Sequence, residues 1–363
     1  MDHTEKSGHS FRVEHPTLFV QKMQKSFAFQ AIFLSIVLKY AVETKTQRKK
    51  FRMKAYVTAP NEQGHILETE VAEPIQDSNQ TLIRVSHFSL NRGELGFAGN
   101  GDGGRQIGWD IAGVVEKPAP DGSGPEAGTR VVAFSRAQRG WAELVTIPAF
   151  DLAVIPSGVE PAQAVVLPVA ALTALYALER GERLLGSKVL ITGATGGVGN
   201  FAVTLAALMG AVVIAQVRRE DQVDEVLALG AHQVVVDSDG TEVTKYGPYR
   251  LVVDGLGNQL TSRAVHSLTP DGRAVLYGVT AGQELFLNAG FMLGTGRGRV
   301  EGFNLYRESE VESISKGLDR LLGLISSGTL KVKIEREGSW SDAPGIAQAL
   351  LDREFGGKAA IRV

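Results

Sequence analysis

The middle of the chain alternates between short, continuous apolar runs and amphipathic stretches. The apolar runs, rich in Val, Ile and Leu, predict strands at 188–192, 212–217, 233–237, 250–254 and 273–279. The stretches between them predict helices at 198–209, 220–229 and 258–268. Strands that are apolar on both faces and are linked by helices form parallel sheets covered on both sides. The pattern therefore predicts an α/β fold with a doubly wound parallel sheet.

The residues before this region follow a different pattern of short strands and frequent turns. Strands are predicted at 81–85, 111–116, 130–134 and 141–147, and a loop dense in Pro, Gly, Asp and Ser at 118–128. A helix rich in Ala and Leu is predicted at 161–180. Beyond Val300, the pattern predicts helices at 308–326 and 343–353 and strands at 331–335 and 358–363. We expect this last segment to complete the β domain.

The first 52 residues fit neither pattern. The apolar stretch at 26–42 is interrupted by three polar residues and is shorter than the roughly 20 residues that span a membrane. No small-residue cleavage site follows it, which argues against a secretory signal. Met53 begins a new pattern. We interpret 1–52 as an N-terminal extension that is disordered or dispensable. The alternative is a helix that lies on a membrane surface.

The composition narrows the chemistry. The 363 residues are 44% hydrophobic and 21% charged, with a net charge of −2, so nothing predicts a nucleic-acid or membrane partner. No stretch predicts a membrane span. The chain has no cysteine, which excludes disulfides, thiolate zinc sites and a cysteine nucleophile. We expect a cytoplasmic protein.

A glycine-rich turn, GATGGVG at 193–199, joins a predicted strand to a predicted helix. Small residues let a backbone approach a pyrophosphate, and the N-terminus of a helix favours its negative charge. The spacing is A-x-G-x-x-G, with alanine at the first glycine position. The residues expected to contact a dinucleotide are Ala194, Thr195, Gly196, Gly197, Val198 and Gly199. The alternative is a tight turn that binds no nucleotide.

The residues after the second strand of this unit indicate which dinucleotide is bound. An acidic residue about 20 positions beyond the glycines would bind the ribose hydroxyls of NAD. Here Arg218 and Arg219 stand there instead, and guanidinium groups suit the 2′-phosphate of NADP. Glu220 and Asp221 are predicted to lie in the first turn of the next helix. We therefore expect NADP(H), although a solvated loop would also carry two arginines.

Seven segments in one order make the chain similar to a known family. They are MKAYVTAP (53–60), LNRGEL (90–95), GWDIAGVVE (108–116), AGTRVVAF (127–134), LPVAALTAL (167–175), GATGGVG (193–199) and GGKAAIRV (356–363). From Met53 to Val363 the chain resembles the medium-chain dehydrogenase/reductase superfamily, in its zinc-independent quinone oxidoreductase and enoyl reductase branch.

The resemblance implies a domain organisation. A GroES-like catalytic β domain is expected at 53–170, a Rossmann NADP-binding domain at 171–300, and a C-terminal return to the catalytic domain at 301–363. The active cleft would lie between the two domains. The family also implies a homodimer.

Departures from the zinc-dependent members predict that this chain binds no metal. It lacks their catalytic cysteine, their Gly-His-Glu motif and their four-cysteine lobe, and 96–105 offers no ligand cluster. His87 is interpreted as structural. Removing hydride from an alcohol without a Lewis acid is difficult, whereas reducing an activated acceptor needs less help. The resemblance therefore implies an NADPH-dependent oxidoreductase acting on a small quinone or an α,β-unsaturated carbonyl (enone).

The resemblance also implies roles for single residues. Asn91 would face the nicotinamide and donate to the developing oxygen of the acceptor, unless it only forms an Asx turn before Arg92 and Gly93. The other residues expected near the cofactor are Thr173, Gly278, Val279, Phe303 and Lys358. Thr173 has an alternative role as a helix hydroxyl bonded to its own backbone.

Three questions stay open from the sequence. Asp110 is interpreted as mainly structural, and no residue is identified as a catalytic acid. The loops 91–105 and 281–299 carry little information about the substrate, and Arg297 and Arg299 belong either to a mobile lid or to a phosphate site. Two other functions remain: a zinc-free alcohol or ketone reductase, and a cofactor-binding redox sensor with little turnover.

Overall fold

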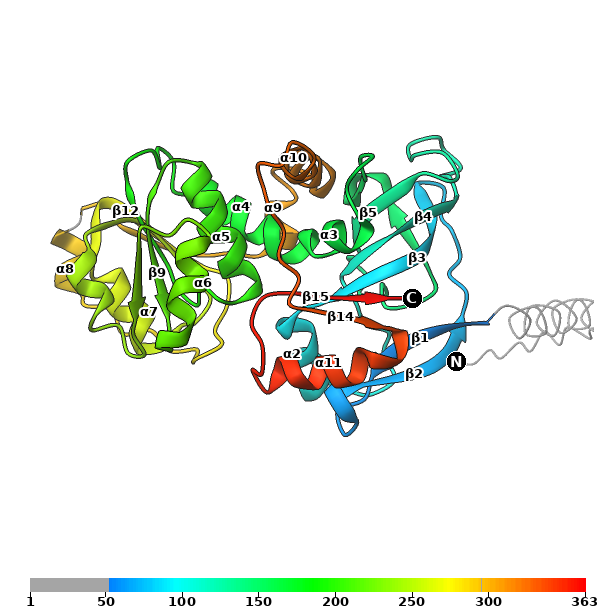
Figure 1. Cartoon of the computed structure of the whole chain (residues 1–363), viewed down its shortest axis with the longest axis horizontal. Helices are drawn as coiled ribbons and strands as arrows, with labels where there is room; N and C mark the ends of the chain where they lie inside the picture. Colours follow the sequence, from blue (N-terminus) through cyan, green and yellow to red (C-terminus); the bar gives the residue numbers. More distant parts are fainter. Residues whose placement is uncertain (1–51, 295) are drawn as a thin grey trace, which may run out of the picture. The chain divides into compact units, whose positions relative to one another are not determined.

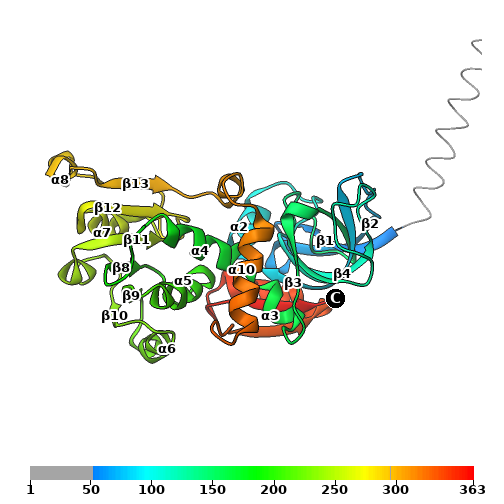
Figure 2. The same cartoon turned by 90° about the horizontal axis from the view of Figure 1, so that it is seen from above.

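The computed structural model describes residues 52–294 and 296–363. The extension predicted for 1–52 lies outside these residues, apart from Arg52, and Met53–Val363 is described below as one unit. Its two large sheets lie at opposite ends, with α3 (Pro161–Val165), α4 (Leu172–Glu179) and α10 (Ile314–Ser326) between them (Figures 1 and 2).

One sheet, within the described residues, has six parallel strands in the order β10-β9-β8-β11-β12-β13. The strands are β8 (Lys188–Ile191), β9 (Val212–Val217), β10 (Gln233–Val236), β11 (Tyr249–Asp254), β12 (Leu268–Leu276) and β13 (Arg299–Gly302). The helices of this region are α5 (Gly197–Leu208), α6 (Val223–Ala228), α7 (Asn258–Val265) and α8 (Ala289–Gly294). The predicted doubly wound sheet is confirmed.

Alternate residues of these strands enter two different cores. Val189 and Val213 pack in the core that includes α4 and α5. Their neighbours Leu190 and Ile214 pack in the core that includes α7. Because successive strand side chains point to opposite faces, a strand buried on both sides must be apolar throughout, as the sequence pattern indicated.

The other sheet, among the same described residues, is mostly antiparallel, in the order β14-β15-β3-β4-β5-β7, with β6 also paired to β3. Its strands are β3 (Gln80–Leu90), β4 (Asp110–Lys117), β5 (Arg130–Phe134), β6 (Leu144–Pro148), β7 (Leu152–Val154), β14 (Arg336–Ser339) and β15 (Ala359–Arg362). Strands β1 (Arg52–Thr58) and β2 (Ile66–Ala72) pair with each other. The remaining helices are α2 (Arg92–Asn100), α9 (Leu305–Glu308) and α11 (Ala343–Leu351).

The C-terminal strands join this sheet directly, because β15 pairs antiparallel with β3 and parallel with β14. The core of this sheet is mostly aliphatic and contains two aromatic stacks. Phe88 stacks on Trp141 with ring centroids 5.3 Å apart, and Tyr56 stacks on Trp340 at 4.8 Å. The chain thus leaves this sheet, builds the parallel sheet, and returns.

Two predicted elements are wrong in position. The strand expected at 331–335 does not form, and β14 begins at Arg336 instead. Val332 and Ile334 pack against the core while Lys333 pairs with Glu225 of α6. The alternation of apolar and polar residues at 331–335 therefore reflects an extended segment that is buried on one side, not a strand of a sheet. The helix expected at 308–326 begins only at Ile314.

Three other predictions were wrong in part. The helix expected at 161–180 is broken by a π-turn at Leu167–Ala171, because Pro168 cannot continue the ladder and the Val169 N–H donates to Asp110. The loop expected at 91–105 contains helix α2, which its glycines concealed from the sequence pattern. Strand β12 also ends at Leu276, before the predicted 279.

Candidate functional site

The glycine-rich turn lies between β8 and α5, and its shape requires glycine at two positions. Gly193 has φ +58°, in the left-handed region. A Cβ on Gly199 would lie 2.3 Å from the Gly193 carbonyl oxygen and 2.8 Å from the Ala194 Cα. No described side chain caps the N-terminus of α5, so the free N–H groups there can bind an anion.

Alanine is tolerated at position 194 because its methyl group points inward. Ala194 is fully buried, its N–H donates to Gln216 O at 3.0 Å, and its carbonyl oxygen accepts from Asn200 Nδ2 at 3.2 Å. The backbone of the turn is therefore held in place from both sides.

The C-terminal segment packs directly on this turn. The Gly357 N–H donates to Thr195 O at 2.8 Å, and Gly196 pairs with Gly357 in a parallel bridge. A Cβ on Gly356 would lie 2.3 Å from Thr195 O. This close approach places Lys358 beside the turn, where its Cδ would lie 3.0 Å from a Cβ on Gly197.

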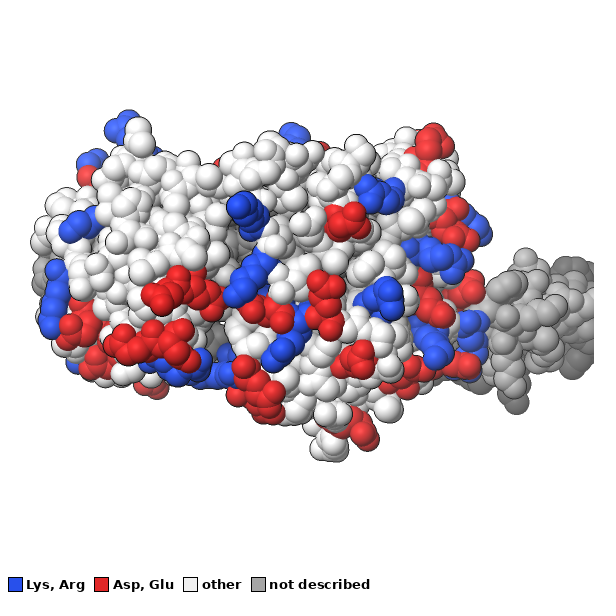
Figure 3. Space-filling view, viewed as in Figure 1, with Lys and Arg blue, Asp and Glu red and all other residues white. Residues whose placement is uncertain are grey.

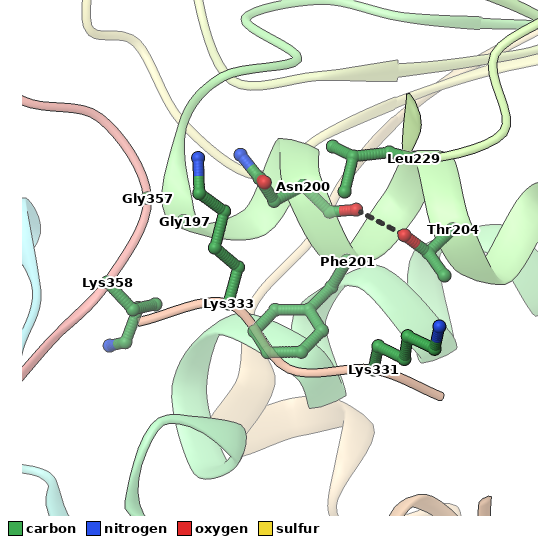
Figure 4. Close-up of a pocket in the computed structure, with 9 residues that line it drawn as sticks. All are labelled: Gly197, Asn200, Phe201, Thr204, Leu229, Lys331, Lys333, Gly357 and Lys358. Atoms are coloured by element: carbon green, nitrogen blue, oxygen red, sulfur yellow. Dashed lines mark hydrogen bonds between the residues drawn. The ribbon is translucent and has the colours of Figure 1, made fainter. Parts of the chain in front are cut away.

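A hollow of about 300 Å³, open to solvent, adjoins the turn (Figure 4). The residues that line it are Gly197, Asn200, Phe201, Thr204, Leu229, Lys331, Lys333, Gly357 and Lys358. Lys333 is paired with Glu225 at 2.9 Å and with Glu335 at 2.6 Å. Basic side chains thus flank the first turns of α5.

The two predicted arginines after β9 differ in their contacts. Arg219 forms an ion pair with Asp221 at 2.9 Å. The Arg218 guanidinium is exposed and has no hydrogen-bond or ion-pair partner among the residues that the structure describes. Gln222 accepts from the Arg218 N–H at 3.2 Å and reaches Thr195 Oγ1 at 3.4 Å. Arg218 is thereby linked to the glycine turn.

Two further arginines, Arg92 and Arg353, act electrostatically on Arg218, and sequence reasoning missed both of them. Partial desolvation lowers the pKa of the exposed Arg218, burial lowers the pKa of Arg92, and the positive charge of Arg353 lowers both further. Arg92 donates to Leu350 O at 2.7 Å, and Arg353 donates to Thr280 O, beyond the end of β12, at 3.2 Å. We call Arg92, Arg218 and Arg353 the arginine cluster.

Beneath the turn lies a buried network of four side chains: Asn91, Glu94, Asp110 and Lys358. The Lys358 ammonium donates to Leu90 O at 3.1 Å, Asn91 Oδ1 at 2.6 Å and Asp110 Oδ2 at 3.0 Å. Asn91 Nδ2 donates to Asp110 Oδ2 at 2.8 Å and to Glu94 Oε2 at 3.0 Å. The network connects α2, β4 and the start of β15.

Asn91 also caps helix α2. Its side chain and the Glu94 carboxyl form a capping box, in which the Asn91 N–H donates to Glu94 Oε2 at 2.9 Å. The pattern Asn-x-x-Glu was the available sequence signal for this helix. The role predicted for Asn91 stays a prediction, and both hydrogens of its amide are already bonded within the network.

Burial raises the pKa of Glu94 to about 8, and the negative charge of Asp110 adds to the rise. Hydrogen bonds from Asn91 and the Trp109 N–H, together with the charge of Lys358, oppose it. Burial dominates because Glu94 is only 1% exposed. The Glu94 carboxyl is therefore mostly protonated at neutral pH.

Glu94 lines a second, shallow hollow beside α2, whose space of about 310 Å³ includes open solvent. Its lining residues are Thr58, Glu94, Phe97, Ala98, Gly101, Asp102, Arg105, Gln106, Ile107 and Gln138. Close to it, Trp109 Nε1 donates to the Tyr306 hydroxyl at 2.7 Å, and that hydroxyl donates to Arg136 O at 3.2 Å. Gln138 Nε2 reaches Tyr306 at 3.4 Å. We call this space the acceptor hollow.

The remaining predicted residues lie in varied settings. Thr173 is buried in α4. Gly278 follows β12, where a Cβ would lie 2.9 Å from Gly255 O, and the Val279 side chain is 53% exposed. Phe303 is half-buried, and the guanidinium carbon of Arg180 lies 5.8 Å from the centroid of the Phe303 ring. Their contact with a cofactor stays a prediction.

The described part of the chain holds few features of other kinds of site. Among residues 52–294 and 296–363, no group of three or more His, Cys, Asp or Glu side chains could hold a metal ion. In the same residues, no helix has the length and apolar character needed to cross a bilayer. On the face drawn in Figure 3, acidic and basic side chains are interspersed. Arg297 is paired with Asp271 at 2.5 Å.

Comparison with known proteins identifies the family. Residues 197–321 match the model of the zinc-binding dehydrogenase family. The chain is 30% identical to a quinone oxidoreductase of Pongo abelii over 175 residues, which are 46% of this chain and 53% of the relative. It is 38% identical to a mycocerosic acid synthase-like polyketide synthase of Mycobacterium tuberculosis over 130 residues, 36% of this chain and 6% of that protein.

The fold comparison extends over more of the chain. A mycobacterial protein solved in complex with NADPH superposes with a TM-score of 0.76 at 22% identity, over 86% of this chain and 100% of that one. These comparisons support the medium-chain dehydrogenase/reductase superfamily, in its quinone oxidoreductase-like branch, as the family that the chain resembles. The predicted family, with its Rossmann and GroES-like domains, is confirmed. The chain spans about half the length of the quinone oxidoreductase that it matches.

Proposed function

We propose that the protein is an NADPH-dependent oxidoreductase that reduces quinones or α,β-unsaturated carbonyls by hydride transfer, without zinc. Membership of the superfamily supports a nicotinamide cofactor. The buried network reaches the glycine turn through Lys358 and the acceptor hollow through Glu94, which supports a second substrate in that hollow.

The residues of the turn fit a dinucleotide. The turn at 193–199 is a cradle that a side chain at Gly199 would fill, and the N-terminus of α5 has no capping side chain among the described residues. We propose that this turn holds the pyrophosphate, and that Thr173, Gly278, Val279 and Phe303 contact the nicotinamide end. When bound, the nicotinamide supplies the hydride.

The observation that carries the choice of NADPH is the arginine cluster. Three guanidinium groups without a carboxylate partner in the described residues repel one another, and a phosphate dianion would relieve that repulsion. We propose that Arg218 binds the 2′-phosphate, with Arg92 and Arg353 adding positive charge. Because Arg219 is already paired with the carboxylate of Asp221, we propose that it contributes less than Arg218 to binding the 2′-phosphate.

Asn91 is proposed to orient the acceptor, but its contribution is constrained. For its amide to donate to an acceptor oxygen, as the resemblance implies, Nδ2 would have to leave Glu94 or Asp110. The enzyme therefore depends on the whole network rather than on one amide.

The test compares Arg218→Asp with the wild-type protein, measuring NADPH and NADH affinity by calorimetry. Losing a charge-assisted hydrogen bond worth about 1.5–3 kcal/mol should weaken NADPH binding by roughly 10- to 150-fold. NADH affinity should stay unchanged. Arg84→Asp makes the same charge change at an exposed ion pair with Glu116 and should leave both affinities unaltered.

Equal weakening of both cofactors by Arg218→Asp would contradict the NADPH assignment. Wild-type protein should also oxidise NADPH when given a quinone or an enone. Tight NADPH binding without turnover on either acceptor class would refute the oxidoreductase and favour a redox sensor.

A further inference from the structure

We propose that Glu94 is the proton donor of the reaction, delivering its carboxyl proton to an acceptor bound in the acceptor hollow. This proposal rests on the proposed reductase function. It concerns a residue that the sequence did not single out.

The first argument is position. Glu94 is almost fully buried, yet it is one of the residues that line the acceptor hollow, together with the mostly exposed Phe97 and the buried Ile107. An acceptor with an apolar ring or chain would contact this wall. The carboxyl group would then lie at the floor of the same space.

The second argument is charge. The network places one ammonium group and two carboxyl groups in a site where Lys358 is 3%, Asp110 0% and Glu94 1% exposed. Asp110 takes the ion pair with Lys358, whereas Glu94 accepts only from neutral N–H groups. A buried carboxylate without a cation is costly, so the proton of the network belongs on Glu94.

The third argument is elimination within the network. All three hydrogens of the Lys358 ammonium are bonded to oxygen acceptors, and both hydrogens of the Asn91 amide are bonded to carboxyl groups. Asp110 is held by Lys358 and by the Val169 N–H. Of the four network residues, Glu94 is the one that lines the hollow, and it also carries an exchangeable proton.

The step balances. The acceptor gains a hydride from the cofactor and a proton from Glu94, whose O–H bond breaks and leaves the electron pair on oxygen. The Asn91 N–H, Asn91 Nδ2 and Trp109 N–H groups then hydrogen-bond the carboxylate that forms. A proton from solvent restores the acid through the open hollow. An enone needs this proton on carbon, so its reduction should depend most on Glu94.

The charged groups around Glu94 set the expected pH dependence. Asp110 on β4 raises the pKa of Glu94, Lys358 before β15 lowers it, and Asp102 and Arg105 line the same hollow. Since the protonated form is the active one, activity should be complete well below pH 8 and should fall as pH rises through about 8.

The experiment measures enone reduction by Glu94→Gln between about pH 6 and 10, with Glu126→Gln, an exposed carboxyl in the 118–128 loop, as the matched control. We expect Glu94→Gln to lower kcat by about 100-fold, within the range for a lost general acid, and to remove the alkaline fall. Infrared spectra of the wild-type protein below the pKa of Glu94 should show a protonated carboxyl band that is absent in this variant.

Three outcomes would overturn the proposal: unchanged kcat, absence of that infrared band in wild type, or a slower variant whose alkaline fall keeps the wild-type midpoint. The last would mean that Glu94 only supports α2. If Glu94→Gln does not fold, Glu94→Asp replaces it. We then expect the alkaline fall in activity to have a shifted midpoint, and an unshifted midpoint would contradict the proposal. Wild type without turnover would instead refute the proposed function, and this proposal with it.

Discussion

Removing the buried ammonium group tests whether the network stabilises the joint between α2, β4 and β15. In Lys358→Met the side chain keeps its stem and loses its charge, so Asp110 and the carbonyl oxygen of Leu90 lose their donor. Lys358 is 3% and Asp110 0% exposed. Breaking one partner of a buried ion pair typically costs about 3–5 kcal/mol, and we expect a loss of that size in the free energy of unfolding at about pH 8.

The loss should shrink at lower pH, which distinguishes charge from packing. In the variant, Asp110 is left as a buried anion without a cation. Taking up a proton removes that charge, so the folded variant binds a proton that wild type does not, and its stability rises relative to wild type as pH falls. At about pH 5 the difference should be clearly smaller than at about pH 8.

Urea unfolding followed by tryptophan fluorescence measures both values. The chain has three tryptophans: Trp141 and Trp340 pack in the core of the mostly antiparallel sheet, and Trp109 packs against the core that includes α4 and α5. Lys333→Met is the matched control, because that lysine is 47% exposed and its surface ion pairs should contribute no more than about 1 kcal/mol. A loss below about 1 kcal/mol at the higher pH, or an equal loss at both pH values, would refute the reasoning.

Three further changes test particular contacts. Gly199→Ala places a methyl group 2.3 Å from the Gly193 carbonyl oxygen, so it should cost roughly 1–3 kcal/mol of stability. It should also weaken NADPH binding, measured by calorimetry, at least about tenfold. Unaltered binding would contradict the proposal that this turn holds the pyrophosphate. Tyr306→Phe leaves Trp109 Nε1 without its acceptor, so urea unfolding should show a loss of about 1–2 kcal/mol and the tryptophan emission should shift. If the stability and the emission both stay as in wild type, the contact is contradicted. Between about pH 4.5 and 8 the folded protein keeps the Glu94 proton that the unfolded chain releases, so the free energy of unfolding falls as pH rises. Glu94→Gln should flatten this slope by up to about 1.4 kcal/mol per pH unit. An equally steep slope in the variant would contradict the raised pKa of Glu94.

Much of the fold could be predicted because its signals are local. Strands β5 and β9 lie at the predicted 130–134 and 212–217, since a run of β-branched residues buried on both faces has few alternatives. The glycine turn is similar, because the clash that a side chain at Gly199 would cause involves only residues 193 and 194. The alternating residues at 331–335 predicted a strand that does not form, because that segment has no neighbouring strand to pair with.

The sequence by itself determined the parallel sheet and the glycine-rich turn, because hydrophobic periodicity and glycine geometry act between near neighbours in the chain. Only the tertiary structure decided the site's electrostatics. Lys358 meets Asn91 across 267 positions, and the charge of Arg353, near the end of the chain, acts on Arg218. Glu94 became a protonated acid only when folding excluded water and placed Asp110 beside it, because the charge state of a carboxyl group depends on its burial and on the charges around it.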